Sequence, residues 1–173
     1  MKIRFSRGLF NWISGNAAGL NKLYPFLIMI AILLAACSPK HPGETELIIT
    51  NSRDNDVKVY AALAVSPAEK RNGLSQYDEI GFNEGMLFIY GNNRHIVFDM
   101  RGARNDLSVA YMDSTGIIKE IFNMIIDPNI VYRSAEKCRY ALQMAYGWFM
   151  ENEILAGDSV QIAREIRSIK PLF

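Results

Sequence analysis

Residues 107–124, LSVAYMDSTGIIKEIFNM, contain two apolar runs separated by a short polar segment. The runs Leu107–Met112 and Ile117–Met124 are rich in the β-branched, aromatic and other apolar residues that favour strands. Between them lies Asp113–Gly116, whose aspartate, serine and glycine are typical of a turn. This combination predicts a β-hairpin.

Similar short runs occur on both sides of this hairpin. In Val57–Ala64, the side chains of Val57, Val59, Ala61 and Leu63 share one face, because side chains alternate along a strand. Further runs of this kind are Glu46–Thr50, Met86–Tyr90, Ile96–Arg101, Arg139–Ala145 and Ser159–Glu165. Short strands joined by turns predict a mainly β fold, a small antiparallel barrel or sandwich.

One or two short helices are expected at the ends of this fold. Ser66-Pro67-Ala68-Glu69 is a capping box, with serine at the N-cap, proline at the first helical position and glutamate at the third. The helix that it starts is expected to end near Gly73. A second short helix is expected within Gly147–Ile154.

The N-terminal segment has the features of a secretory signal. Its apolar run, Phe26–Ala36, is shorter than the roughly 20 residues that a membrane-spanning helix needs, and the preceding residues are basic without any acid. The run ends in Leu34-Ala35-Ala36-Cys37, which resembles a bacterial lipobox, the site of cysteine lipidation and cleavage. An ordinary signal with a chance cysteine and an uncleaved anchor are the alternatives.

This interpretation divides the chain into three parts. Residues 1–36 are expected to be a lipoprotein signal peptide, residues 37–45 the lipidated Cys37 with a flexible tether, and residues 46–173 a single β-rich domain. The lipid on Cys37 is expected to hold the protein to a membrane of the cell envelope. Ser38 follows the cysteine and supplies no evident retention signal, which favours the outer membrane, facing the periplasm, in a cell with two membranes.

Composition argues against several classes of function. The chain has 19 basic and 18 acidic residues. All four basic residues of the leader are removed with it, so the mature part is weakly acidic and nucleic acid is not an expected partner.

Cys138 is expected to be a buried, inert thiol. Asn51, Asp54, Asn55 and Asp56 resemble a loose oxygen-ligand loop but are expected to form a turn, so neither a metal nor a cofactor is predicted.

A series of short motifs occurs over about residues 57–162. They are Arg71-Asn72-Gly73-Leu74, Gly85-Met86-Leu87-Phe88, Phe98 and Met100, Tyr111-Met112-Asp113, Tyr132, Arg139-Tyr140-Ala141-Leu142, Gly147 and Gly157-Asp158. This series resembles the bacterial and archaeal family known as domain of unknown function 192. The resemblance implies a small, mainly β fold with a polar cluster around a Phe-Trp-Met-Lys-Asn-Thr segment, and it implies no settled activity.

This chain departs from the family pattern at that cluster. The matching segment is Phe98–Ala103, in which Asp99 replaces the tryptophan and Arg101 replaces the lysine. Ser108 stands where the family has an aspartate, and Gln143 stands where it has a glutamate. If the family cluster is a ligand site, this chain has either rebuilt it or lost it.

The candidate ligand-binding residues are His95, Asp99, Arg101, Arg71 and Gln143. As a strand, residues 95–101 place His95, Asp99 and Arg101 on one face and the apolar Ile96, Phe98 and Met100 on the other. Arg101 suits a carboxylate or phosphate, and His95 and Asp99 are possible pH-sensitive partners. The alternative is a solvated strand face with a weak Asp–Arg contact.

The sequence favours a non-catalytic binding or accessory module of unknown ligand. Its partner is expected to be a small anionic ligand or an envelope protein. The alternatives are an enzyme of unassigned reaction and a structural or interaction module without a small-molecule site. An enzyme is less favoured because the chain has no Gly-x-Ser-x-Gly motif and no glycine-rich phosphate loop.

Overall fold

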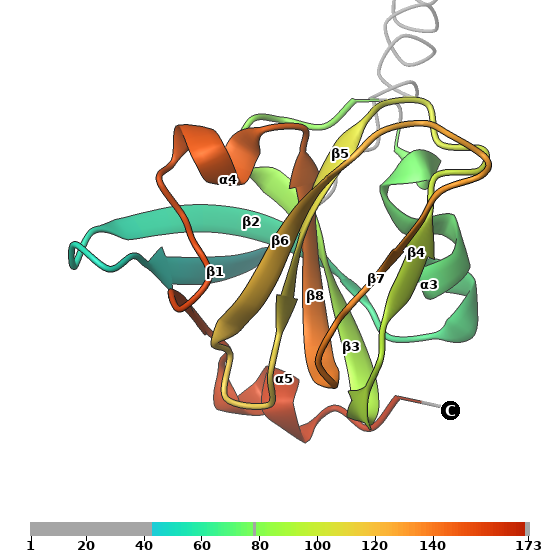
Figure 1. The fold of residues 1–173 in the computed structure, drawn as a ribbon. Helices are drawn as coiled ribbons and strands as arrows, with labels where there is room; N and C mark the ends of the chain where they lie inside the picture. Colours follow the sequence, from blue (N-terminus) through green and yellow to red (C-terminus); the bar gives the residue numbers. More distant parts are fainter. Residues whose placement is uncertain (1–42, 78, 172–173) are drawn as a thin grey trace, which may run out of the picture. The chain divides into compact units, whose positions relative to one another are not determined.

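The strands of the computed structural model form a curled sheet that carries a second, smaller sheet on one face (Figure 1). The structure describes residues 43–77 and 79–171. The predicted signal peptide, Cys37 and the first part of the tether lie outside the described residues. Within the described ranges, no helix has the length and apolar character needed to span a membrane.

Eight of the strands in the described residues correspond to predicted segments, with some changes in length, and β7 is an additional one. The strands are β1 (Thr45–Thr50), β2 (Asp56–Ala64), β3 (Glu84–Arg94), β4 (Val97–Asp99), β5 (Leu107–Met112), β6 (Ile118–Met124), β7 (Val131–Arg133), β8 (Cys138–Ala145) and β9 (Ser159–Gln161). The helices are α3 (Pro67–Asn72), α4 (Trp148–Glu151), α5 (Arg164–Ser168) and a 3₁₀ turn, η1 (Gly73–Gln76). The mainly β fold and the two expected helices are confirmed, and α5 is an additional one.

The large sheet has seven strands in the order β6-β5-β8-β3-β2-β1-β9, and β4 pairs with β7 in the small sheet. All pairs are antiparallel except β2 with β3. That parallel pair requires a crossover, which α3 and η1 supply between the two strands.

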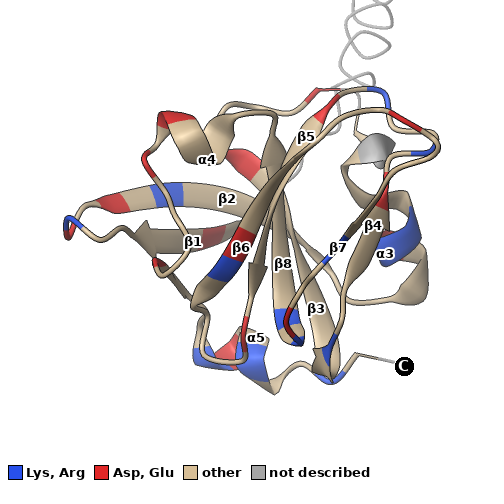
Figure 2. Ribbon diagram, in the orientation of Figure 1, with Lys and Arg blue, Asp and Glu red and all other residues tan. Residues whose placement is uncertain are grey.

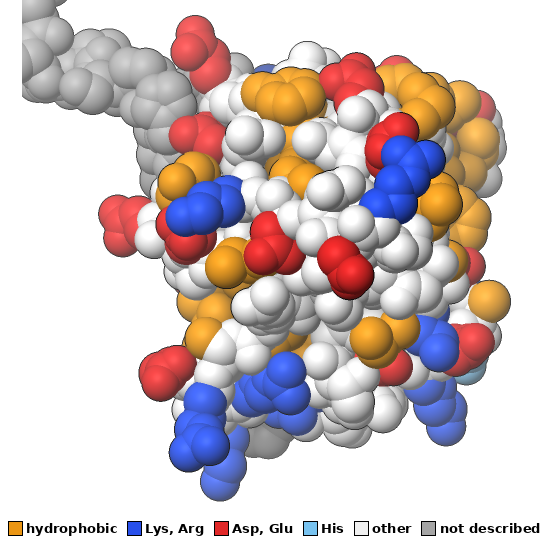
Figure 3. Space-filling model, turned by 90° about the vertical axis from the view of Figure 1, so that its left-hand side faces the viewer, with side chains coloured by type: hydrophobic (Ala, Val, Ile, Leu, Met, Phe, Trp, Pro, Cys, Tyr) orange, Lys and Arg blue, Asp and Glu red, His pale blue; other side chains and the backbone are white. Residues whose placement is uncertain are grey.

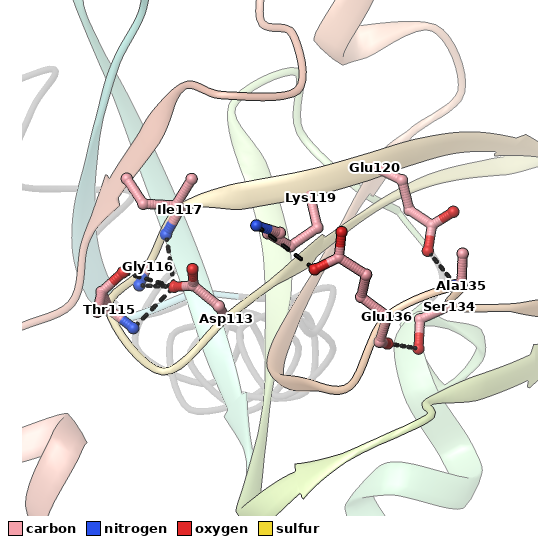
Figure 4. A network of polar contacts seen from close by, with 9 residues as sticks. All are labelled: Asp113, Thr115, Gly116, Ile117, Lys119, Glu120, Ser134, Ala135 and Glu136. Atoms are coloured by element: carbon pink, nitrogen blue, oxygen red, sulfur yellow. Dashed lines mark hydrogen bonds and ion pairs between the residues drawn. The ribbon is translucent and has the colours of Figure 1, made fainter.

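The predicted hairpin is formed by β5 and β6, and Asp113 organises its turn. The Asp113 Oδ1 atom accepts hydrogen bonds from the backbone N–H groups of Thr115 (2.8 Å), Gly116 (3.1 Å) and Ile117 (3.2 Å) (Figure 4). Two further contacts tie β6 to the β7–β8 connection: Lys119 pairs with Glu136, and Glu120 accepts from the Ala135 N–H. Local hydrogen bonds to Asp113 therefore fix the turn, and contacts between more distant residues hold β6 to the β7–β8 connection.

The turn also brings the two ends of the large sheet together. Ile117 forms a β-bridge with Ser159 in β9. The Val160 N–H donates to the Gly116 carbonyl at 2.8 Å, and the Ile118 N–H donates to the Asp158 carbonyl at 2.9 Å. The two edges of the curled sheet are therefore joined at this end, next to α5 (Figure 1).

Two apolar cores lie on opposite faces of the central strands. The first includes strands from both ends of the sheet and so lies inside its curl, with Leu47, Ile49, Val59, Leu87, Leu142, Trp148, Val160 and Ile166 among its members. The second, the outer core, lies between the outer face of the large sheet and the layer made by α3, η1, β4 and β7. Its members include Leu74, Phe88, Phe98, Val109, Tyr111 and Tyr132. Because β5 is covered on both faces, all six of its residues are buried.

Charged groups are spread over the surface without one dominant sign. Acidic and basic side chains alternate on the face that carries α4 and the β1–β2 hairpin, with basic groups gathered at its lower edge (Figure 3). Hydrophobic side chains on that face form small separate areas. The basic part of α3 lies beside β4 at a different place on the molecule (Figure 2).

Candidate functional site

The capping box fixes where α3 begins and therefore where its last turn lies. The Ser66 Oγ accepts from the Glu69 N–H at 3.3 Å, and the Glu69 Oε2 accepts from the N–H groups of Ser66 (2.7 Å) and Val65 (2.9 Å). These backbone hydrogen bonds lower the pKa of Glu69. The helix ends at Gly73, whose backbone has a φ of 55°. The prediction of this helix from the sequence is confirmed.

The segment 95–101 alternates as the sequence predicted. Ile96, Phe98 and Met100 are buried in the outer core, whereas Asp99 and Arg101 are exposed. Phe98 packs edge-on against Phe88, with ring centroids 4.7 Å apart. This packing holds β4 on the outer face of the large sheet and leaves its polar side chains toward α3.

Between the end of α3 and β4 lies a hollow of about 270 Å³. Its rim comes from the last turn of α3 and from the segment that includes and follows β4, and its floor comes from β3, β5 and β8. The lining residues are Lys70, Arg71, Asn72, Gly73, Leu74, Phe88, Val97, Phe98, Asp99, Met100, Arg101, Ala103, Leu107 and Gln143. Charged side chains therefore lie around the opening, and apolar side chains such as Phe88 and Leu107 contribute to the lining.

The three cations on the rim have different surroundings. The Nε and Nη2 atoms of Arg101 donate to the Asp99 carboxylate at 3.1 and 2.9 Å, which lowers the pKa of Asp99. Lys70 Nζ lies 4.6 Å from the centre of the Tyr90 ring, and burial, together with Arg94, lowers the pKa of Lys70. Arg71 is exposed and has no ion pair or side-chain hydrogen bond with any residue that the structure describes.

Gln143 on β8 forms part of the floor. The residue is only 5% exposed, and its Oε1 atom is buried without a hydrogen-bond partner. A Cβ atom placed on Gly73 would lie 3.3 Å from this oxygen, so Oε1 points toward the lining of the hollow at Gly73. Buried polar atoms usually have a partner in the folded protein, and this acceptor has none within the described chain.

The structure brings together four of the five residues that the sequence suggested for binding. Arg71, Asp99, Arg101 and Gln143 all line the hollow, although they come from α3, the β4 segment and β8. His95 is not among the lining residues, and its Nδ1 lies 2.9 Å from the Ser134 carbonyl oxygen. Participation of all five in binding stays a prediction.

Several lining residues were not singled out from the sequence. Lys70 precedes Arg71 in the same helical turn, so a basic pair at a predicted helix end was the available signal. Phe88, Met100 and Leu107 carried no such signal because each also belongs to the outer core. Their access to the hollow depends on how the small sheet sits on the large one.

Ser108 lies outside the hollow and has a structural role. Its hydroxyl is buried, accepts from the Gly147 N–H at 2.9 Å and donates to Asn123 Oδ1 at 2.6 Å. Ser108 therefore positions the turn before α4. The other changes from the family pattern, at positions 99, 101 and 143, converge on the hollow instead.

Other candidate chemistry finds less support among the described residues. None of their His, Cys, Asp and Glu side chains form a group suited to a metal ion. The Asn51–Asp56 segment forms a turn in which Asn51 Oδ1 accepts from the N–H groups of Arg53 and Asn55, each at 3.0 Å. Cys138 is fully buried, and burial raises the pKa of its thiol to about 11, which suits an inert side chain.

Comparison with known proteins identifies relatives of this domain. The model of the DUF192 family, described as "Uncharacterized ACR", matches residues 48–162. A search of curated proteins finds no match.

Two crystal structures share the fold. A proposed transcription regulator from Sinorhizobium meliloti 1021 is 22% identical with a TM-score of 0.65, and the match covers 69% of this chain and 95% of that one. A protein of unknown function from Novosphingobium aromaticivorans DSM 12444 is 21% identical with a TM-score of 0.64, covering 73% of this chain and 94% of that one.

Proposed function

The chain belongs to the DUF192 family, whose description assigns no reaction, and from this premise we propose a lipid-anchored envelope protein that binds a small anion without catalysis. The proposed binding site is the hollow between α3 and β4. Anchoring is supported by the sequence Leu34-Ala35-Ala36-Cys37 at the end of the apolar leader. The outer membrane, facing the periplasm, is the proposed location in a cell with two membranes.

The observation that carries the binding proposal is the convergence of Arg71, Arg101 and Lys70 on one hollow that contains a single carboxylate, Asp99. Guanidinium groups bind carboxylates and phosphates through paired N–H donors. Arg101 uses Nε and Nη2 on Asp99, which leaves its Nη1 for a ligand. Arg71 has its entire guanidinium available on the same rim.

A catalytic role has less support than binding. The Asp99 carboxylate is held by Arg101, which lowers its pKa and makes it a poor proton acceptor at neutral pH. The thiol of Cys138 belongs to the buried outer core and is absent from the hollow lining. The groups that do reach the hollow are suited to holding a charged ligand.

Ligand-induced stabilisation tests this proposal. The segment Pro39–Phe173 forms a compact unit that contains both apolar cores, so it is expected to fold without the leader. Its melting temperature is measured against inorganic phosphate, sulfate and citrate. An anion at 100 times its dissociation constant stabilises the fold by roughly 2.7 kcal/mol, a shift of several degrees for a domain of this size.

Two arginine variants separate a specific site from general charge effects. Arg71→Ala is expected to weaken the affinity for the anion about tenfold, because a charge-assisted hydrogen bond contributes roughly 1.5–3 kcal/mol. The melting temperature then rises less at the same anion concentration. Arg164→Ala removes the same charge at the exposed start of α5, outside the hollow, and is expected to leave the response unchanged. Equal losses in both variants, or no stabilisation by any of the three anions, would contradict the proposal.

A further inference from the structure

The inner end of the hollow has a different hydrogen-bonding requirement from its rim. Gln143 Oε1 is a hydrogen-bond acceptor that is buried and unpartnered, and it lies against Gly73, which like Gln143 lines the hollow. A fully ionised carboxylate or phosphate monoester group at the rim does not satisfy this atom, because such a group offers only acceptors. The unsatisfied oxygen requires an N–H or O–H donor.

The rim and the floor therefore define two ends of one ligand. The three cations and one carboxylate on the rim leave an excess of two positive charges, which matches the dianionic form of a phosphate monoester. Apolar residues that line the hollow include Phe88, Met100 and Leu107, which suits a short carbon chain. The hollow of about 270 Å³ limits the ligand to a small molecule.

We propose that the hollow recognises a small phosphate monoester that carries a hydroxyl or amino group at the end opposite its phosphate. The phosphate binds Arg71 and the free Nη1 of Arg101, and the hydroxyl or amino group donates to Gln143 Oε1. This assignment rests on the proposed anion site and adds the chemistry of the inner end. A phospholipid does not fit it, because the acyl part would meet the buried polar oxygen.

Two probes that differ only in hydroxyl groups test the assignment. Glycerol 3-phosphate and n-propyl phosphate have the same carbon chain and the same charged group. Calorimetric titration of Pro39–Phe173 is expected to show about tenfold tighter binding of glycerol 3-phosphate, the effect of supplying a donor to a buried acceptor. Equal affinities for the two probes would overturn the inference.

Variants at Gln143 and Arg71 test which side chain causes the preference for glycerol 3-phosphate over n-propyl phosphate. Gln143→Met has nearly the same size and only a weak sulfur acceptor, so both probes are expected to bind it nearly equally. Gln143→Glu keeps an acceptor and is expected to retain the preference while weakening both probes through charge repulsion. Arg71→Ala is expected to weaken both probes with an unchanged ratio. Thermal unfolding of each variant shows that the fold is intact.

The outcomes distinguish this inference from the proposed function. If both probes bind equally and depend on Arg71, the inference is wrong and the anion site stands. If inorganic phosphate binds through Arg71 but neither probe binds, the inference is again wrong. If no phosphate compound binds and no other anion stabilises the fold, both are wrong. A preference that persists unchanged in Gln143→Met also overturns the assignment of the donor to Gln143.

Discussion

At the scale of single residues, Asp113 shows how one carboxylate can hold a strand connection. Its Oδ1 atom accepts from three backbone N–H groups and from the Thr115 hydroxyl at 2.6 Å. Burial alone would raise the pKa of Asp113, but these hydrogen bonds outweigh it and lower the pKa. The turn is therefore most stable when this carboxyl is ionised.

Replacement of Asp113 is expected to weaken the fold in a pH-dependent way. Asp113→Ala should lower the free energy of unfolding by roughly 1–3 kcal/mol, and Asp113→Asn by less because it keeps an oxygen acceptor. The folded-state pKa lies below the unfolded value of about 3.9, so the contribution is complete well above that pH and is lost as pH falls through the folded pKa. Urea unfolding from pH 7 to pH 3 measures this. A constant difference between wild type and Asp113→Asn across that range would contradict it.

The sequence alone predicts those features of the site that depend on neighbouring residues, and it does not predict those that depend on contacts between distant segments. The alternation at 95–101 and the capping box at Ser66 and Glu69 depend on neighbours within a few positions, so both were predictable and both are present. The unpartnered state of Gln143 Oε1 was not, because it depends on Gly73 and the β4 segment meeting β8. His95 belonged to the predicted face but binds the Ser134 carbonyl, a contact between distant segments.

At the scale of elements, the closure between β6 and β9 depends on a close backbone approach at Gly116. This glycine has a φ of 98°, and a Cβ atom there would lie 2.3 Å from the Val160 carbonyl oxygen. Gly157 has a φ of 102° but has no atom within 4 Å of the same position. At both positions the positive φ would strain any residue other than glycine. Only at Gly116 would an added side chain also collide with neighbouring backbone.

Alanine at these two positions should separate strain from closure. Gly157→Ala is expected to cost about 1–2 kcal/mol, the penalty for a side chain at positive φ. Gly116→Ala is expected to cost roughly 1–3 kcal/mol more, because the added methyl forces β9 away from the turn. Thermal and urea unfolding of both variants measure the difference. Equal destabilisation would mean that the contact between Gly116 and Val160 does not hold the ends of the sheet together.

The end of β9 and the start of α5 could not be predicted from local sequence patterns. The residues from Ser159 to Glu165 were predicted as one strand, and their apolar alternation through Val160 and Ile162 supports that prediction. In the structure β9 ends at Gln161, and α5 begins at Arg164. The Arg167 side chain donates to the carbonyls of Ile162 (2.8 Å) and Thr115 (3.2 Å), so the helix is held by contacts with a turn far away in sequence.

The pairing of strands shows the same limit. Hairpins such as β5–β6 connect neighbouring segments, and the turn residues between them indicate the pairing. The parallel pairing of β2 with β3 has no comparable signal, because it depends on the path of the crossover through α3. Mainly β content was therefore predictable, whereas the strand order was not.

At the scale of the whole molecule, the proposed lipid anchor determines where the hollow operates. Replacement of Cys37 by serine is expected to abolish acylation and to leave a longer precursor, since the sulfur is the proposed acceptor of the lipid. Growth with labelled palmitate, followed by electrophoresis of the immunoprecipitated protein, measures both effects. Continued incorporation of label in Cys37→Ser would show that the lipobox interpretation is wrong.

The pairing of the first strand with the last has a consequence for how this molecule matures. β1 pairs with β9 through Ile48 with Gln161, Ile49 with Val160 and Thr50 with Ser159. Contacts between such distant parts of a chain slow folding, because a large loop must close before they form. During synthesis, the edge of β1 that pairs with β9 stays open until almost the entire chain has been made. For the exported protein proposed above, this late pairing favours the extended chain that a translocation channel requires.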